Sequence, residues 1–160
     1  MRKMIVATTA AVVMLLLAPA VFAQETVTDI FGIEVGTVMG YNFSTEDIGA
    51  GESMAVSFGF GEQFEASLMF IDGDGVDMPD FSLLRMSYYL LDEVGLQIST
   101  GSSGGTVAAG FGVFSYPIRR VFNDTLTTAL GLDLDYLVPD IAVDPDEGVI
   151  AFGLNATVAF

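Results

Sequence analysis

The last thirteen residues alternate between large apolar and small side chains, and this pattern constrains the fold more than any other feature. Residues 148–160 read G-V-I-A-F-G-L-N-A-T-V-A-F. Successive side chains of a β-strand point to opposite faces, so one face of this strand would be apolar and the other small and weakly polar. Neither face carries a charge, which fits a strand with lipid on one side and a narrow barrel interior on the other.

Seven further segments alternate in the same way. Each is close to the nine to eleven residues that a tilted membrane-spanning strand requires. Lipid offers no partner to backbone groups, so such a sheet must close on itself. The sequence therefore predicts an all-β fold, a closed antiparallel up-and-down eight-stranded transmembrane β-barrel formed by residues 24–160. The seven segments are Phe31–Asn42, Ser53–Gly61, Phe64–Ile71, Ser82–Leu91, Val94–Gly101, Thr106–Tyr116 and Leu126–Val138.

The C-terminal stretch resembles the closing strand of small bacterial outer-membrane β-barrels of the OmpA and OmpX types. The resemblance implies the outer membrane of a diderm bacterium, a monomer in contact with outer-membrane lipid, and a structural or surface-interaction role. It also implies that the barrel-insertion machinery reads the last strand. The residues expected to form this assembly signal are Phe152, Leu154, Ala156, Val158 and Phe160.

Residues 1–23 have the pattern of a secretory signal peptide. Arg2 and Lys3 form a basic start, residues 4–18 are mostly apolar, and Val21–Ala23 precede an expected cut at Gln24. The alternative is a short membrane anchor, but no basic stop-transfer segment follows. The absence of cysteine at the cut excludes a lipoprotein.

Composition narrows the possible functions. Two of the five basic residues lie before residue 24 and all 21 acidic residues follow it, so residues 24–160 carry a net charge of −18. Such a chain lacks the electrostatic footprint of a nucleic-acid-binding protein. It contains no histidine and no cysteine. Outer-membrane barrel enzymes resemble this chain in topology but use histidine, so we predict that it is not an enzyme.

The predicted connections differ in length and charge. Long outer loops are expected at Asn42–Glu52, Asp72–Asp80 and Pro139–Glu147, where eleven of the 21 acidic residues lie. Short turns are expected at residues 61–63 and 91–94. A short outer loop at residues 101–105 and a long inner turn at Pro117–Thr125 depart from this alternation. Aromatic residues would form two interfacial girdles, one of them including Phe81.

The second acidic loop contains a candidate metal site. Asp72, Asp74 and Asp77 place three carboxylates close together, as an oxygen-seeking cation such as Ca²⁺ requires. The loop lacks the glycine and the glutamate of an EF-hand. The alternative is that these acids only solvate the loop. No other cofactor is predicted.

The predicted barrel interior carries five charged side chains. Glu34, Glu65, Asp133 and Asp135 face inward, with Arg85 as the one inward cation. We expect Arg85 to pair with Asp133 and Asp135, because a buried charge needs a partner. The rest of the interior would be lined mostly by glycine, alanine and serine, and hence be hydrated and acidic. An alternative function is therefore a narrow cation-preferring pore. A soluble β-sandwich would require charged outer faces, which these strands lack.

Overall fold

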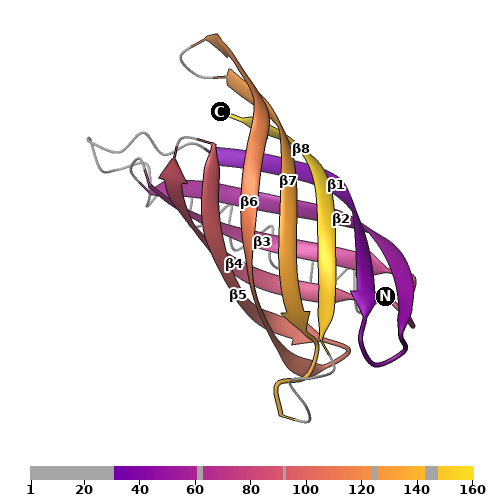
Figure 1. The fold of residues 1–160 in the computed structure, drawn as a ribbon. Coiled ribbons are helices and arrows are strands. Elements are labelled where there is room, and N and C mark those ends of the chain that lie inside the picture. The colour runs from indigo at the N-terminus through magenta and orange to yellow at the C-terminus, as the bar shows by residue number, and fades with distance from the viewer. Residues whose placement is uncertain (1–30, 61–62, 92, 124–125, 143–147) are drawn as a thin grey trace, which may run out of the picture.

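The computed structural model describes residues 31–60, 63–91, 93–123, 126–142 and 148–160; the predicted signal peptide lies outside them. They form one closed barrel in which each strand pairs antiparallel with the next (Figure 1). This confirms the predicted fold class. No helix among the described residues is long and apolar enough to cross a membrane. The strands are β1 (Phe31–Asn42), β2 (Asp47–Phe60), β3 (Phe64–Gly73), β4 (Phe81–Leu91), β5 (Val94–Ser103), β6 (Thr106–Asn123), β7 (Leu126–Val138) and β8 (Val149–Ala159).

The first and last strands close the barrel. β1 pairs with β8 from Gly32 opposite Ala159 to Asn42 opposite Val149. Beyond this ladder, the backbone N–H of Phe31 donates to the carbonyl of Phe160 at 3.1 Å, and the N–H of Phe160 donates back at 2.8 Å. The end of the barrel at Phe31 and Phe160 is called the termini end here, and the opposite end, with the β1–β2 turn and the β3–β4 loop, the loop end.

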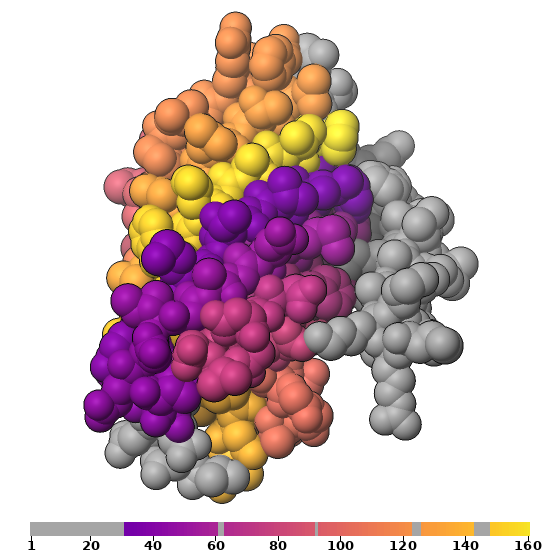
Figure 2. All heavy atoms as spheres, turned by 90° about the vertical axis from the view of Figure 1, so that its right-hand side faces the viewer, coloured from indigo at the N-terminus to yellow at the C-terminus, as the bar shows by residue number. Residues whose placement is uncertain are grey.

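The strands are strongly staggered. Following paired residues once around the barrel from Phe31 leads back to β1 at Tyr41, a displacement of ten residues. A stagger of this kind tilts the strands by roughly 40° to the barrel axis. The slanted bands of β8, β1, β2 and β3 in Figure 2 show this tilt. An eleven-residue strand at this tilt spans about 25 Å along the axis, which matches the apolar band of outer-membrane barrels.

Large apolar side chains cover the outside of the barrel. Their alternation follows the predicted faces on every strand. Exposing so many apolar groups to water would be unfavourable in a soluble protein, but a lipid environment requires such a surface. Examples from each strand, in chain order and all 47–64% exposed, are Val35, Met54, Phe64, Leu84, Ile98, Phe111, Leu134 and Phe152.

Aromatic rings gather at both ends of this apolar surface. At the termini end, Phe31 contacts Phe58 and Phe160, and Phe64 contacts Tyr88. At the loop end, rings of Tyr41, Phe43, Tyr136 and Phe111 form a chain of contacts. The prediction for Phe81 was wrong: this ring turns into the barrel and is 2% exposed.

The interior is mostly apolar toward the loop end. The buried apolar cluster includes Met78, which is fully buried although it lies in the loop between β3 and β4. The expected hydrated interior is therefore wrong for this half of the barrel, because inward positions near the loop end carry larger side chains than glycine, alanine or serine. The other members of the cluster are Val38, Ala55, Met69, Ile71, Phe81, Leu83, Ala108, Leu137, Val149 and Ala151.

Two predicted connections are strands instead. The expected loop Asn42–Glu52 is mostly strand, because β2 already begins at Asp47 and pairs with β1 from its first residue. Glycine and acidic residues are unfavourable in strands, so local propensity pointed away from this extension. Glycine is needed at positions 49 and 51, because the backbone of the β3–β4 hairpin lies where a Cβ atom would be.

The expected inner turn Pro117–Thr125 is also mostly strand, since β6 continues to Asn123. The register between β6 and β7 shifts between Ser115 and Ile118, and this β-bulge contains Pro117. Proline lacks a backbone N–H and is tolerated at bulges and strand edges. The predicted short turns include residues 61, 62 and 92, which lie outside the described residues.

A larger residue at Gly73 is expected to displace the Met78 segment from the barrel mouth. A Cβ atom at Gly73 would collide with the carbonyl oxygen of Met78. We expect Gly73→Val to destabilise the barrel by about 1–3 kcal/mol through overpacking, measured by urea unfolding in phospholipid vesicles. Ala50→Val, on the exposed outward face of β2, is the control and should unfold like the wild type. Equal stability of the two variants would contradict the packing described for this mouth.

Candidate functional site

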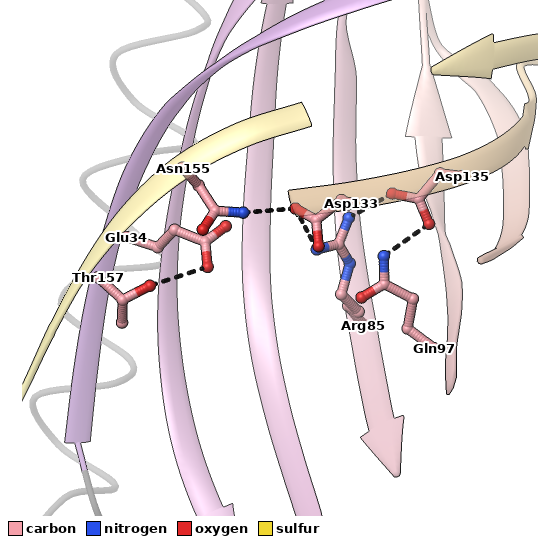
Figure 3. Close-up of polar contacts among 7 residues, drawn as sticks. All are labelled: Glu34, Arg85, Gln97, Asp133, Asp135, Asn155 and Thr157. Atoms are coloured by element: carbon pink, nitrogen blue, oxygen red, sulfur yellow. Dashed lines mark hydrogen bonds and ion pairs between the residues drawn. The ribbon is translucent and has the colours of Figure 1, made fainter. Parts of the chain in front are cut away.

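A buried polar network crosses the middle of the barrel. Arg85 on β4 is 4% exposed and lies between Asp133 and Asp135 of β7 (Figure 3). Its Nη2 donates to Asp135 Oδ2 at 2.9 Å, and its Nη1 lies 3.9 Å from Asp133 Oδ2. The structure therefore brings together the three charged residues that alternation placed on the inward faces of two strands.

Two neutral side chains extend this network. Gln97 on β5 donates from Nε2 to Asp135 Oδ1 at 2.7 Å, and Asn155 on β8 donates from Nδ2 to Asp133 Oδ2 at 2.6 Å. Each aspartate thus has one cationic and one amide neighbour. The sequence analysis did not single out Gln97 or Asn155 as members of a site. Their inward position in the alternation was the available signal.

Glu34 and Glu65 lie nearer the termini end and form no ion pair within the described part of the chain. The hydroxyl of Thr157 donates to Glu34 Oε2 at 3.4 Å, a long hydrogen bond. The hydroxyl of Tyr89 donates to Glu65 Oε2 at 3.1 Å. Each of these carboxylates therefore accepts a hydrogen bond from a hydroxyl group on a neighbouring strand.

Glycines on adjacent strands make room for the network. Gly112 is paired with Asp135, and Gly131 is paired with Asn155. A Cβ atom at Gly112 would collide with Asp135 Oδ1, and one at Gly131 with Asn155 Oδ1. The small inward residues thus leave space for long polar side chains that fill the same cross-section.

The network links β4, β5, β7 and β8 across the interior. Within the described residues only Arg85 Nε and Asn155 Oδ1 are buried side-chain polar atoms without a hydrogen-bond partner. A nearly complete network of this kind fixes the relative position of the strands that supply it. Its chemistry is structural, because its charged groups are already engaged with one another.

The three loop aspartates have different surroundings. Asp74 Oδ1 accepts from the N–H of Met78 at 2.9 Å, and Oδ2 accepts from the N–H of Ala50 at 3.0 Å. These backbone hydrogen bonds lower the pKa of the exposed Asp74 carboxyl below its usual range. Asp74 therefore holds the β3–β4 loop against β2 and keeps Met78 in the barrel mouth.

The backbone hydrogen bonds of Asp74 concern the predicted cation site, which consists of Asp72, Asp74 and Asp77. No group of three or more acidic side chains in the described residues is arranged to hold a metal ion. Both oxygens of Asp74 are already occupied by backbone donors. Calcium binding by this loop stays a prediction.

The predicted assembly signal occupies the outside of β8. Phe152, Leu154, Val158 and Phe160 are 38–54% exposed, and Ala156 shares their outward face. These side chains lie where lipid or an assembly factor can contact them. The arrangement is compatible with recognition of this strand.

Comparison with known proteins gives few matches. No protein-family model matches the sequence, and no curated protein matches it. The chain is similar to a de novo designed transmembrane β-barrel, with a TM-score of 0.46 and 15% identity, covering 84% of this chain and 98% of that one. It is also similar to Ail, the attachment invasion locus protein of Yersinia pestis in complex with the heparin analogue sucrose octasulfate, with a TM-score of 0.44 and 13% identity, covering 82% and 99%. The closed sheet and the apolar exterior themselves define the fold as an eight-stranded transmembrane β-barrel.

Removing the central cation should destabilise the barrel strongly. Arg85→Gln would leave Asp133 and Asp135 buried without a cation, and we expect a loss of about 3–5 kcal/mol in the free energy of unfolding. Urea unfolding in phospholipid vesicles measures this loss. The double variant Arg85→Gln, Asp135→Asn removes both members of the shorter ion pair and should recover part of the stability. A double variant less stable than Arg85→Gln alone would contradict this account.

Proposed function

We propose that this protein is an integral outer-membrane β-barrel of a diderm bacterium, with a structural or surface-interaction role and no enzymatic activity. The observation that carries the proposal is the apolar exterior of a sheet closed by β1 and β8. Closure satisfies the backbone in lipid, and the exposed apolar side chains supply the lipid-facing surface. The signal-peptide pattern of residues 1–23 supports export.

The termini end would face the periplasm and the loop end the outside of the cell. The acidic residues support a surface role, because most of those outside the barrel interior gather at the loop end, whereas Glu93 in the β4–β5 turn lies at the termini end. An exposed negative surface favours cationic partners and repels anionic ones. The residues concerned are Glu46, Asp47, Glu52, Asp72, Asp74, Asp77, Asp80 and Asp140.

Assembly and partners follow from the same proposal. Outer-membrane lipid would contact the apolar exterior, and the barrel-insertion machinery would read the outward residues of β8. A monomer suffices, because the described barrel closes within a single chain.

The proposal is tested by cell fractionation and by gel electrophoresis with and without boiling. We expect the full-length protein in the outer-membrane fraction, with the unheated barrel migrating faster than the boiled chain because closed barrels resist unfolding in detergent. Truncation of the last strand after Gly148 is the control and should abolish the fast band. Recovery of the intact protein in the soluble periplasmic fraction, with a single heat-independent band, would overturn the proposal.

The alternative of a cation-preferring pore has less support. The interior near the loop end is filled by apolar side chains, among which Met78, Leu137 and Val149 have no exposed surface. These buried apolar side chains interrupt the polar lining that a hydrated ion would need to follow.

We therefore expect no channel activity. The purified barrel in planar lipid bilayers should stay electrically silent at high salt, whereas a porin inserted under the same conditions serves as the positive control. Reproducible cation-selective conductance steps from the folded protein would favour the pore instead.

A further inference from the structure

Strand β6 of the β6–β7 hairpin extends beyond its neighbour β5 at the termini end. β5 begins at Val94, which pairs with Ser115, whereas β6 continues to Asn123. Residues 117–123 of β6 therefore pair only with β7 among the described residues. Residues 117–123 and 126–130 are called the β6–β7 extension here. On its other side, β7 stays paired with β8 as far as Thr127 opposite Ala159. The extension stands at the top of the barrel in Figures 1 and 2.

The register assigns the two arginines of the extension to opposite faces. Ile118 pairs with Leu130 and Arg120 with Thr128, and these partners in turn pair with Ala156 and Val158 on the outward face of β8. Arg119 pairs with Ala129, whose partner on β8 is the inward Thr157. Arg120 therefore lies on the same face as the outward apolar surface and next to its edge, whereas Arg119 lies on the opposite face.

Arg120 is held among exposed apolar groups. Its guanidinium carbon lies 5.1 Å from the centre of the Phe122 ring, a cation–π contact. Ile118 and Phe122 are 59% and 55% exposed. No ion pair to Arg119 or Arg120 occurs within the described part of the chain, and the third cation there, Arg85, is buried. The exposed positive charge of the described residues is thus confined to this extension.

We propose that the outward face of the β6–β7 extension binds the phosphate group of an anionic phospholipid, with Arg120 as the anion-binding residue. The proposal rests on the membrane position given under the proposed function. A guanidinium forms paired hydrogen bonds with phosphate oxygens. Ile118 and Phe122 beside it suit the boundary between acyl chains and headgroups, where aromatic side chains and arginine are favoured. These apolar neighbours favour a lipid over an acidic peptide as the ligand.

The negative charge of the rest of the chain opposes binding of an anionic lipid everywhere except near the two exposed arginines. A chain with a net charge of −18 after residue 23 is repelled by an anionic membrane surface. One arginine at headgroup depth is therefore placed to attract anionic lipid locally. The outer loops lie at the opposite end of the barrel and do not reach this contact.

The test uses the full barrel folded into two kinds of vesicle. One is phosphatidylcholine alone, and in the other about a third of the lipid is phosphatidylglycerol. The unfolding equilibrium in urea is read from the heat-sensitive gel band. We expect phosphatidylglycerol to favour the folded wild-type protein on the order of fivefold. Arg120→Gln should lose most of this gain while matching the wild type in pure phosphatidylcholine. Arg119→Gln makes the same charge change on the other face and should keep the gain.

Three outcomes would overturn the proposal. The first is a folded wild-type barrel that responds equally to both lipids. The second is an equal loss in Arg119→Gln and Arg120→Gln, which would indicate net charge rather than a site. The third is equal stabilisation of the barrel in pure phosphatidylcholine by a hexaglutamate peptide, which would indicate an acidic peptide ligand. Failure of the proposed membrane location would appear differently, as a chain that gives no heat-sensitive band in either vesicle.

Discussion

Backbone pairing between β1 and β8 is the interaction on which the rest of the structure depends. It joins the first described strand to the last and leaves the sheet closed. Without it, two rows of backbone groups would be unpaired, which lipid does not tolerate. The stagger of ten residues that this closure fixes also sets the strand tilt and the width of the interior. The space available to inward side chains is thus decided by the closure.

The interior uses that space in two ways. Toward the loop end it is filled by apolar side chains and by Met78 from the β3–β4 loop. In the middle it holds the Arg85 network, where glycines such as Gly112 and Gly131 stand opposite the long polar groups. Both parts are packed with side chains, as expected for the smallest closed barrels. The outer surface between the two ends is mostly apolar. The two ends of the barrel therefore differ mainly in their charged residues.

Much of the fold could be predicted because membrane strands repeat a simple alternation. β7 was predicted with its observed bounds, and β1 likewise, since both alternate without interruption. β2 and β6 were predicted too short. In β2, glycine and acidic residues obscure the pattern, yet the neighbouring strand and the loop backbone support it. In β6, Pro117 suggested a break, but a bulge absorbs it. Local propensity is overridden in both cases by pairing with a neighbouring strand.

The sequence by itself determined which side chains face the interior, because that depends only on a period of two residues along each strand. This placed Arg85, Asp133 and Asp135 on inward faces. Only the tertiary structure decided the depth at which they meet, since depth depends on the register between strands and on the stagger of the closed sheet. For the same reason the sequence did not reveal that Met78 enters the barrel mouth or that Arg119 and Arg120 extend beyond β5. Those positions depend on where neighbouring strands end, which no single segment encodes.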